Sequence, residues 1–345
     1  MVELIVTNFN RNFTGVSATA ANVIRQQVSH HDLRLVGHPL PGCPDPIPLT
    51  EARRLSRDPA PGRASTIWHV RRNPEMRAAI WARDVLRLPV RIVFTSAAQR
   101  RHSAVPRWLI SRMDAVIATT DAAAGFVPHV RAVVPHGVDT DLFTPAPDRM
   151  AAWAALGHGG QMGIATIGRI RPEKGTDLFV EAMLRLLPDL PGATALVVGR
   201  AAREHQPFML KLMDRVQRAG MIDRIRFIRE VPAAELPTLM RALSLVMQLP
   251  RYEGYGMVPL EGMASGVPFV GADAGYYSTF AAQGRSGLVV AQEAAADAAD
   301  AALSILRDAG RHLAMAGAAR RLAVENFSAA TEAAGIERVY DEIWS

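Results

Sequence analysis

The chain has 345 residues, 49% of them hydrophobic and 21% charged, with a formal net charge of +6. This length suits two globular domains, each with its own core. The single cysteine, Cys43, excludes a disulfide framework within the chain and a cysteine-rich metal site, as is usual in a reducing compartment. No apolar run reaches membrane-spanning length, and residues 1–6 do not read as a signal peptide. We therefore expect a cytoplasmic protein, or one that is peripheral to a membrane on its cytoplasmic side.

The first half of the chain alternates short apolar strands with helices. Strands are predicted at residues 2–7, 33–37, 66–70, 90–95, 115–119 and 132–135. Helices are predicted at residues 15–27, 74–88 and 106–113. Residues 39–62 contain seven prolines and two glycines, so this segment is predicted to be a long irregular excursion.

The alternation restarts after a predicted linker at residues 143–147. Strands are predicted at residues 163–170, 193–199, 225–230, 245–249, 268–271 and 287–290. Helices are predicted at residues 176–187, 204–219, 233–242 and 257–264, and in the alanine-rich tail from residue 293. Such alternation predicts an α/β fold with parallel sheets covered on both faces. We expect two Rossmann-like, doubly wound domains facing a cleft, at residues 1–143 and 144–327, with a final helix at 328–345 that packs back on the first domain.

The charge of the chain is uneven. Residues 51–112 contain fourteen arginines and four acidic residues. A block this basic indicates an anionic partner, such as phosphate, nucleic acid or acidic lipid; the alternative is a solvated basic face in an arginine-rich chain. The only lysines are Lys174 and Lys211, so a lysine at 174 hints that a compact point charge is needed there.

Two glutamates, Glu253 and Glu261, follow the predicted strand at 245–249 with seven residues between them. The first opens the turn Glu253-Gly254-Tyr255-Gly256, and a helix is predicted from Met257. Glycines let backbone amides approach a ligand closely, and the positive end of a helix attracts phosphate. Amides beside two acceptor carboxylates suit a nucleotide sugar. The plain alternative is a strand, a turn and a capped helix with two surface glutamates.

A second stretch carries cations beside a predicted helix start. It reads Gly168-Arg169-Ile170-Arg171-Pro172-Glu173-Lys174-Gly175. A strand is predicted to end at Gly168 and a helix to open after Gly175, so Arg169 and Lys174 lie next to a helix N-terminus, where anions bind well. We interpret the stretch as an anion clamp; the alternative is a basic surface loop.

Both stretches resemble motifs of the family 4 retaining glycosyltransferases, which have two Rossmann-like domains (the GT-B fold). The first resembles their E-x7-E motif and the second their G-R-x4-K-G motif. The resemblance implies that Arg169 and Lys174 hold the donor diphosphate and neutralise its charge as it leaves. It also implies that Glu253 holds a hydroxyl of the transferred sugar and that Glu261 binds the ribose hydroxyls.

The resemblance extends to single positions elsewhere. The catalytic residues that it implies are His69, Arg169, Lys174 and Glu253. The donor-binding residues that it implies are Gly15, Gly168, Arg169, Lys174, Glu253, Gly254, Tyr255, Gly256, Met257 and Glu261. One departure is the segment Gly275-Tyr276-Tyr277-Ser278-Thr279, which stands where family members usually read Gly-Gly-x-x-Glu and lacks that carboxylate.

Two predicted strand ends in the first half carry histidines and arginines. His69 is expected at the carboxyl edge of its sheet, facing the cleft; the alternative is a structural histidine. The segments at 68–73 and 94–102 resemble the lipopolysaccharide core mannosyltransferases of alphaproteobacteria. That resemblance implies a GDP-mannose donor and a lipid-A-linked Kdo acceptor. The acceptor-binding residues expected here are Arg71, Arg72, Arg100, Arg101 and His102.

The sequence therefore predicts a retaining glycosyltransferase that moves mannose from GDP-mannose onto an anionic glycolipid at the cytoplasmic face of the inner membrane. No cofactor or metal is expected, because Asp139 and Asp141 are interpreted as turn and cap residues. One alternative is an enzyme of the same fold that uses a UDP-sugar in exopolysaccharide or glycolipid synthesis. Less favoured are a nucleotide-sugar epimerase, against which the E-x7-E motif speaks, and a nucleic-acid-binding protein, because the basic block lacks a recognised binding motif.

Overall fold

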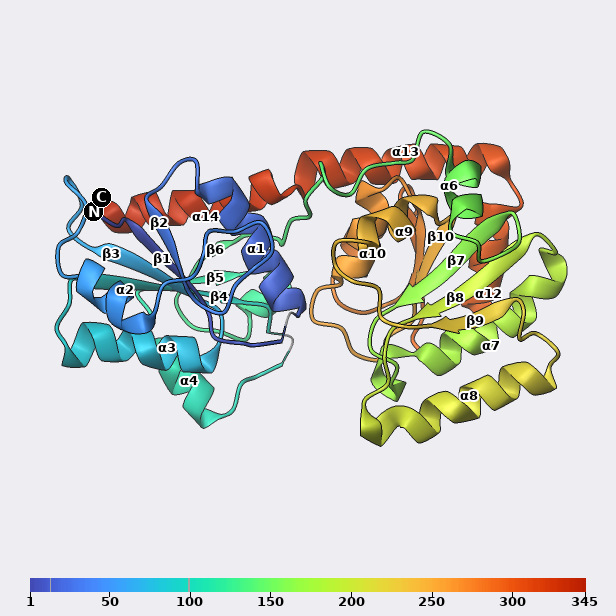
Figure 1. Cartoon of the computed structure of the whole chain (residues 1–345), viewed down its shortest axis with the longest axis horizontal. Coiled ribbons are helices and arrows are strands. Elements are labelled where there is room, and N and C mark those ends of the chain that lie inside the picture. The colour runs from blue at the N-terminus through green and yellow to red at the C-terminus, as the bar shows by residue number, and fades with distance from the viewer. Residues whose placement is uncertain (13, 99) are drawn as a thin grey trace. The chain divides into compact units, whose positions relative to one another are not determined.

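The computed structural model describes residues 1–12, 14–98 and 100–345. The chain divides into two compact units: unit 1 comprises Met1–Gly137 and Phe327–Ser345, and unit 2 comprises Val138–Asn326. Each unit has one six-stranded sheet in which every pairing is parallel, with helices on both faces (Figure 1). The predicted pair of Rossmann-like domains is thereby confirmed. None of the helices in the described ranges is long and apolar enough to span a membrane.

The sheet of unit 1 has the order β2-β1-β3-β4-β5-β6. Its strands are β1 (Leu4–Asn8), β2 (Leu33–Gly37), β3 (Thr66–Val70), β4 (Val90–Ser96), β5 (Ala115–Ala118) and β6 (Val130–Val133). Its helices are α1 (Gly15–Gln27), α2 (Leu49–Leu55), α3 (Asn73–Ile80), the π-helical turn η1 (Trp81–Val85), α4 (Ala104–Ser111), α5 (Asp121–Ala124) and α14 (Ala329–Trp344). One sheet face packs against α1 and α14, and the other against α2, α3 and α4.

The last helix, α14, completes unit 1 (Figure 1). Its Glu332 accepts a hydrogen bond from the Gly137 amide at 2.7 Å and contacts His136 Nδ1 at 2.8 Å. Trp344 Nε1 donates to the Ser65 carbonyl at 3.0 Å, and Tyr340 is fully buried. Because these contacts place buried aromatic and acidic groups against the sheet, α14 is part of the core of unit 1.

Two sequence expectations about the chain path were wrong. Residues 49–55 of the proline-rich segment form α2, where Glu51 and Arg54 pair one turn apart and Ala52 is buried; the flanking prolines masked this short run of helix formers. The division between units falls at Gly137 and not at residue 143. Arg320 of unit 2 donates to the carbonyls of Thr140 and Phe143 at 3.1 and 2.8 Å, which holds this segment on unit 2.

The sheet of unit 2 has the order β12-β11-β10-β7-β8-β9. Its strands are β7 (Met162–Ile167), β8 (Ala193–Val198), β9 (Ile225–Ile228), β10 (Leu245–Gln248), β11 (Phe269–Ala272) and β12 (Gly287–Val290). Its α-helices are α6 (Arg149–Ala155), α7 (Thr176–Leu186), α8 (Gln206–Arg218), α9 (Leu236–Ala242), α10 (Met257–Ala264), α11 (Tyr277–Ala281), α12 (Ala295–Leu306) and α13 (Ala309–Asn326). The 3₁₀ turns are η2 (Pro172–Lys174), η3 (Leu187–Asp189) and η4 (Arg203–His205).

Strand order reverses once in each sheet, between β1 and β3 in unit 1 and between β7 and β10 in unit 2. In doubly wound sheets, ligands bind outside the carboxyl ends of the strands at such a reversal. The loops that follow β7 and β10 carry the two motif stretches of unit 2. The loop that follows β1 leads to Gly15 at the start of α1, and the segment that follows β3 carries Arg71 and Arg72. The topology therefore points to one candidate edge in each unit.

Candidate functional site

The loop after β7 forms a compact cationic turn. Gly175 ends η2 in the left-handed conformation (φ 66°) and directly precedes α7. A side chain at Gly175 would overlap the Leu249 carbonyl, so glycine lets the start of α7 lie against the end of β10. Arg169 is exposed and has no ion-pair or hydrogen-bond partner among the described residues. Its guanidinium is therefore available to an anion.

The two motif stretches of unit 2 meet at one ion pair. Lys174 Nζ lies 2.6 Å from Glu253 Oε2, although the residues are 79 positions apart. Glu253 Oε1 accepts a hydrogen bond from the Gly254 amide at 2.9 Å, which fixes the carboxylate beside its own turn. A cation and a carboxylate are thus held together at the carboxyl edge, with about a fifth to a quarter of each side chain exposed (24% and 20%).

Glu261 lies on α10, which begins after Gly256 as predicted. Gly256 has a φ of 107°, and a side chain there would overlap the ring of Tyr277. Burial raises the pKa of the Glu261 carboxyl to about 8, although part of the residue remains accessible. The group is therefore a neutral acid at pH 7 in the ligand-free protein.

The aromatic residue of the E-x7-E turn lies in the core of its loop. Tyr255 is 4% exposed and stacks on Tyr276 with ring centroids 5.4 Å apart. Both rings meet Phe280 edge-on. The expected contact of Tyr255 with a donor is therefore limited to its backbone, and its ring supports the turn. Tyr276 belongs to the segment that departs from the family pattern, and it fills the space behind the turn.

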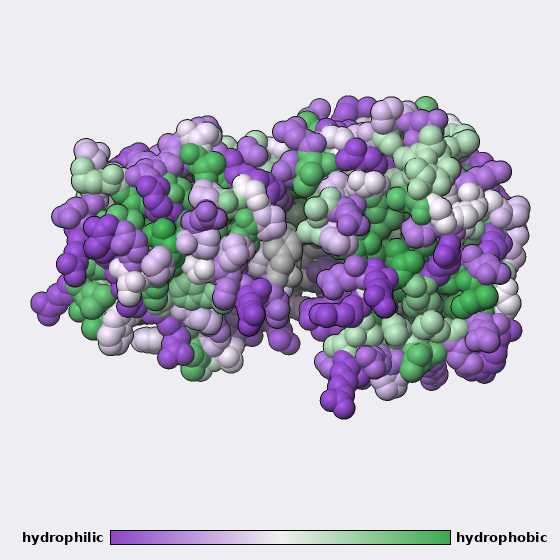
Figure 2. Space-filling view, viewed as in Figure 1, coloured by the Kyte–Doolittle hydropathy of each residue, from purple (hydrophilic) through white to green (hydrophobic). Residues whose placement is uncertain are grey.

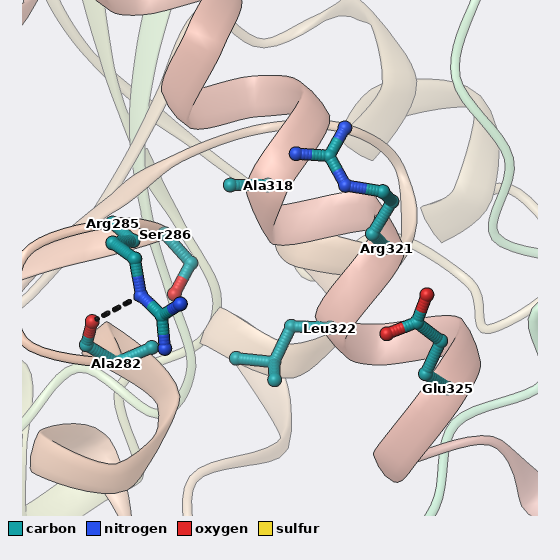
Figure 3. Close-up of a pocket in the computed structure, with 7 residues that line it drawn as sticks. All are labelled: Ala282, Arg285, Ser286, Ala318, Arg321, Leu322 and Glu325. Atoms are coloured by element: carbon teal, nitrogen blue, oxygen red, sulfur yellow. Dashed lines mark hydrogen bonds between the residues drawn. The ribbon is translucent and has the colours of Figure 1, made fainter.

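We compare two of the surface hollows formed by the described residues of unit 2. The smaller encloses about 190 Å³ of space open in part to solvent and is lined by motif residues, including Gly168, Arg169 and Lys174. The larger, of about 460 Å³, lies between the turn after α11 and α13, where Arg285 and Leu322 point toward one another (Figure 3). Arg285 donates to the Ala282 carbonyl at 3.1 Å. We assign the site to the smaller hollow, because the cationic stretch at residues 168–174 lines it and the strand order reverses there.

The candidate edge of unit 1 is organised by Glu75, which is fully buried. Its carboxylate accepts hydrogen bonds from the amides of Phe9, Arg71 and Arg72 at 2.8–3.1 Å. It also contacts Arg72 Nη1 at 3.0 Å, and Arg72 Nη2 reaches Ser17 of α1 at 3.0 Å. The guanidinium of Arg72 therefore joins α1 to α3, and its contacts support a positioning role in place of the expected acceptor contact.

His69 is a core residue and does not face an open edge. It is fully buried, with Nδ1 2.5 Å from Tyr340 Oη and Nε2 2.7 Å from Thr95 Oγ1. Burial, and then the charges of Arg71 and His136, hold its pKa well below the usual value, so the ring is neutral. Both nitrogens are engaged by side chains, and we withdraw His69 as a catalytic group; the structural alternative describes it correctly.

Arg71 differs from Arg72 because some of its guanidinium donors have no hydrogen-bond partner among the described residues. It is 8% exposed, and its Nε and Nη1 have no hydrogen-bond partner among the described residues. Burial lowers the pKa of this guanidinium, and the nearby Tyr340, Glu332 and Glu75 oppose the shift. A buried cation with free donors is costly unless an anion completes it. Arg71 is therefore the strongest anion-binding candidate in unit 1.

The loop after β4 carries the other residues expected at the acceptor. Arg100 and Arg101 are exposed. His102 has a buried Nε2 without a partner, and burial, followed by the charge of Arg100, lowers its pKa. β3 and β4 are paired in parallel, so the loops that follow them leave the same edge of the sheet as Arg71. Gly15 is the first residue of α1, with open space where a side chain would be.

Comparison with known proteins identifies the family. A model described as glycosyl transferases group 1 matches residues 156–322. The lipopolysaccharide core biosynthesis mannosyltransferase LpsB of Rhizobium meliloti (strain 1021) is 39% identical over 349 residues, covering 99% of this chain and 98% of that protein. The corresponding mannosyltransferase LpcC of Rhizobium leguminosarum bv. viciae is 40% identical over 346 residues, covering 99% and 97%. The chain belongs to the group 1 glycosyltransferases.

Solved structures agree with the fold of this glycosyltransferase. The C-terminal domain of a group 1 protein, LpcC, from Francisella tularensis is 31% identical and covers 56% of this chain and 99% of that one, with a TM-score of 0.54. Anabaena Alr3699/HepE, solved with UDP and glucose, covers 99% of this chain and 100% of that one at a TM-score of 0.83 and 16% identity. The GT-B fold expected from the motifs is confirmed.

Sequence reasoning missed Arg251 of this glycosyltransferase. It lies between β10 and Glu253, and its guanidinium contacts both carboxylate oxygens of Asp177 at 2.9 and 2.8 Å. It also contacts Glu293 and the Pro172 carbonyl, each at 2.5 Å. These contacts tie η2 and the start of α7 to the Glu253 turn. Hydrogen bonds to Asp177, and next to Glu293, raise the pKa of Arg251. A single arginine after a strand gave no signal of this role.

Asp139 behaves as a turn residue. Its Oδ1 accepts hydrogen bonds from the amides of Asp141 and Leu142 at 3.2 and 3.0 Å. This is the side-chain-to-backbone pattern of an Asx turn. The interpretation of Asp139 as a turn residue is therefore confirmed; that the glycosyltransferase needs no metal stays a prediction.

Proposed function

We propose that this glycosyltransferase moves mannose from GDP-mannose onto a lipopolysaccharide core acceptor of the Kdo-lipid A type, with retention at the anomeric carbon. The observation that carries the proposal is the meeting of Lys174 and Glu253 at the strand-order reversal of unit 2. The choice of sugar and acceptor is supported by the two relatives that span nearly the whole chain and are named for mannose transfer in core synthesis.

The donor is assigned to unit 2. Arg169 and Lys174 bind the diphosphate, and the N-terminus of α10 adds backbone dipoles. Glu261 binds the ribose hydroxyls, and Glu253 a hydroxyl of the sugar. The bond from the anomeric carbon to the diphosphate breaks, and a bond to the acceptor oxygen forms on the same face. The leaving phosphate takes the proton of the acceptor hydroxyl, and the two cations stabilise the charge that develops on it.

The acceptor is assigned to unit 1. A Kdo-lipid A acceptor carries carboxylates and phosphates, which pair with the planar guanidinium of arginine. Arg71 has the free donors for such a pair, and Arg100, Arg101 and His102 follow the neighbouring strand. The expected location, at the cytoplasmic face of the inner membrane, stays a prediction.

The test is a panel of GDP-, UDP- and ADP-sugars with a Kdo-lipid A acceptor, followed by mass spectrometry and analysis of the anomeric configuration of the product. GDP-mannose is expected to give an α-linked mannosyl product. Lys174→Ala should lower kcat/KM by roughly 10- to 150-fold, as for the loss of one charge-assisted hydrogen bond. Lys211→Ala, which changes the exposed lysine of α8, is the matched control. Transfer only from a UDP-sugar would overturn the donor assignment, and normal turnover in Lys174→Ala would remove Lys174 from the site.

A further inference from the structure

Two helical segments of unit 1 expose large apolar side chains. Trp81, Val85 and Leu86, on η1 and its end, are 51%, 54% and 44% exposed. Val105 and Trp108 of α4 are 66% and 58% exposed. The other three tryptophans of the chain, Trp68, Trp153 and Trp344, are at most 9% exposed. Tryptophan is large enough that such exposure at two sites calls for a partner.

The two segments are neighbours that share one core cluster. Met76 and Ala82, from α3 and η1, pack into the same core cluster as Leu109 of α4, below one face of the sheet. Asp84 of η1 and Arg112 at the end of α4 form an ion pair at 2.6 Å. Since their buried faces share one core, their outer faces turn to solvent together. We call Trp81, Val85, Leu86, Val105 and Trp108 the tryptophan surface.

The charge around the tryptophan surface is positive. Arg77, Arg87 and Arg107 are exposed and have no ion-pair partner among the described residues. The nearby acids Asp84 and Asp114 are already paired, Asp84 with Arg83 and Arg112 and Asp114 with Arg83 and Arg91. In the space-filling view, the surface over α3 and α4 mixes hydrophobic, weakly polar and hydrophilic residues (Figure 2).

We propose that the tryptophan surface docks unit 1 on an anionic lipid bilayer. Tryptophan prefers the level of the headgroups, where its ring is apolar and its N–H is hydrated. Free arginines beside it gain affinity from acidic headgroups. A bilayer satisfies both features, whereas a soluble anion would leave the tryptophans in water.

Docking would place the acceptor loop at the lipid surface. Val105 lies in the first turn of α4, directly after the loop that carries Arg100, Arg101 and His102. A sugar that projects from a lipid anchor would meet that loop without leaving the bilayer. This benefit rests on the proposed function, because it assumes a lipid-linked acceptor; binding to the bilayer does not.

The experiment is co-sedimentation of the full chain with vesicles of phosphatidylethanolamine and phosphatidylglycerol, compared with phosphatidylcholine alone. We expect binding to the anionic vesicles only, and protection of the exposed tryptophans from acrylamide quenching. Trp81→Ser/Trp108→Ser should lower vesicle binding at least tenfold. Arg77→Gln/Arg87→Gln/Arg107→Gln should lower it about fivefold for each arginine, the equivalent of ~1 kcal/mol. Leu210→Ser/Leu313→Ser changes two residues of unit 2 that are 59% and 74% exposed, and this control should bind as the wild type does.

Three outcomes would overturn the proposal: no binding of the wild type to anionic vesicles, equal losses in the tryptophan variant and the leucine control, or self-association that the tryptophan variant abolishes. The last would make the surface an interface between copies of the chain. Transfer to acceptor dispersed in detergent should be unchanged in all surface variants. If the wild type bound vesicles but transferred no sugar in detergent, the proposed function would fail while the docking surface stood.

Discussion

The carboxyl of Glu261 favours its neutral form in the ligand-free protein. Its carboxyl has a pKa of about 8 through burial, yet two ribose hydroxyls are bound best by the ionised form, which only accepts hydrogen bonds. Binding should therefore release a proton below pH 8. We predict that GDP affinity rises about tenfold per pH unit from pH 6 to 8, where one proton is released, and is level above. Calorimetry in buffers of different ionisation enthalpy measures both the affinity for GDP and the number of protons released on binding.

The controls separate the two glutamates. Glu261→Gln should bind GDP weakly, without this slope, and Glu253→Gln should keep both affinity and slope. Equal losses in the two variants would contradict the division of roles. Stability should follow the same titration. A carboxyl whose pKa is raised on folding loses stability as pH rises from its unfolded value through about 8. The melting temperature of Glu261→Gln, relative to wild type, should thus increase over that range.

Arg71 and Arg72 are neighbours with opposite predicted phenotypes. Arg71→Ala should raise the acceptor KM at least tenfold and leave donor hydrolysis intact, because its unpaired donors face no protein acceptor. Arg72→Ala should leave the acceptor KM nearly unchanged but cost about 1–3 kcal/mol of stability, since the buried Glu75 loses a charged partner. Acceptor kinetics give the KM of both variants, and chemical denaturation gives their free energies of unfolding. A rise in KM for Arg72→Ala alone would reverse the assignment.

At the scale of single residues, the sequence was a good guide to which positions are important. It was a poorer guide to the role of each residue. Lys174 and Glu253 were both predicted to bind the donor, and they lie 2.6 Å apart. His69 and Arg72 had equally suggestive positions after a strand. Their contacts come from Tyr340 and Ser17, 271 and 55 residues away. No local sequence pattern encodes such distant partners. A residue that faces a ligand therefore cannot be told from a core residue whose hydrogen bonds are all made within the protein.

At the scale of elements, Arg251 ties η2 and α7 to the turn after β10. We predict that Arg251→Ala lowers kcat/KM roughly 10- to 100-fold and weakens GDP binding, because Lys174 is no longer held where we propose that the diphosphate binds. Amide exchange at residues 169–176 should become faster. If Arg251 only contacted phosphate directly, its loss would not change this exchange rate. Arg185→Ala, which breaks an exposed pair with Asp300, is the control. Unchanged exchange and affinity would mean that η2 is stable without Arg251.

Regular elements were easier to predict than their connections. The strands follow from short apolar runs that are buried on both faces, such as β1, where all five residues are buried. The irregular pieces did not follow. α2 was hidden by prolines, and α6 follows the expected linker, at residues where no helix was predicted. Both are seven residues long and depend on tertiary packing, since helices this short have little stability of their own.

At the scale of the whole molecule, the two units should unfold separately. Each has its own sheet and core, and the C-terminal domain of the Francisella relative was solved by itself. We predict two calorimetric transitions, one for each unit. GDP should raise the midpoint temperature of the unit 2 transition and leave that of unit 1 unchanged. Tyr340→Ala should lower the free energy of unfolding of unit 1 alone, by about 3–5 kcal/mol, as other truncations of buried aromatic side chains do. One transition that moves as a whole in both experiments would contradict this division.

The return of α14 to unit 1 has a consequence for biosynthesis. A ribosome delivers all six strands of unit 1 first, then the whole of unit 2, and only then the helix that covers His69, Val134 and the β1 strand face. During that interval the first sheet waits with apolar surface exposed, while the second domain is already able to fold. A chain that stops before α14 carries a complete unit 2 and an unfinished unit 1. Quality-control proteases would meet the defect in the part of the protein that was made first.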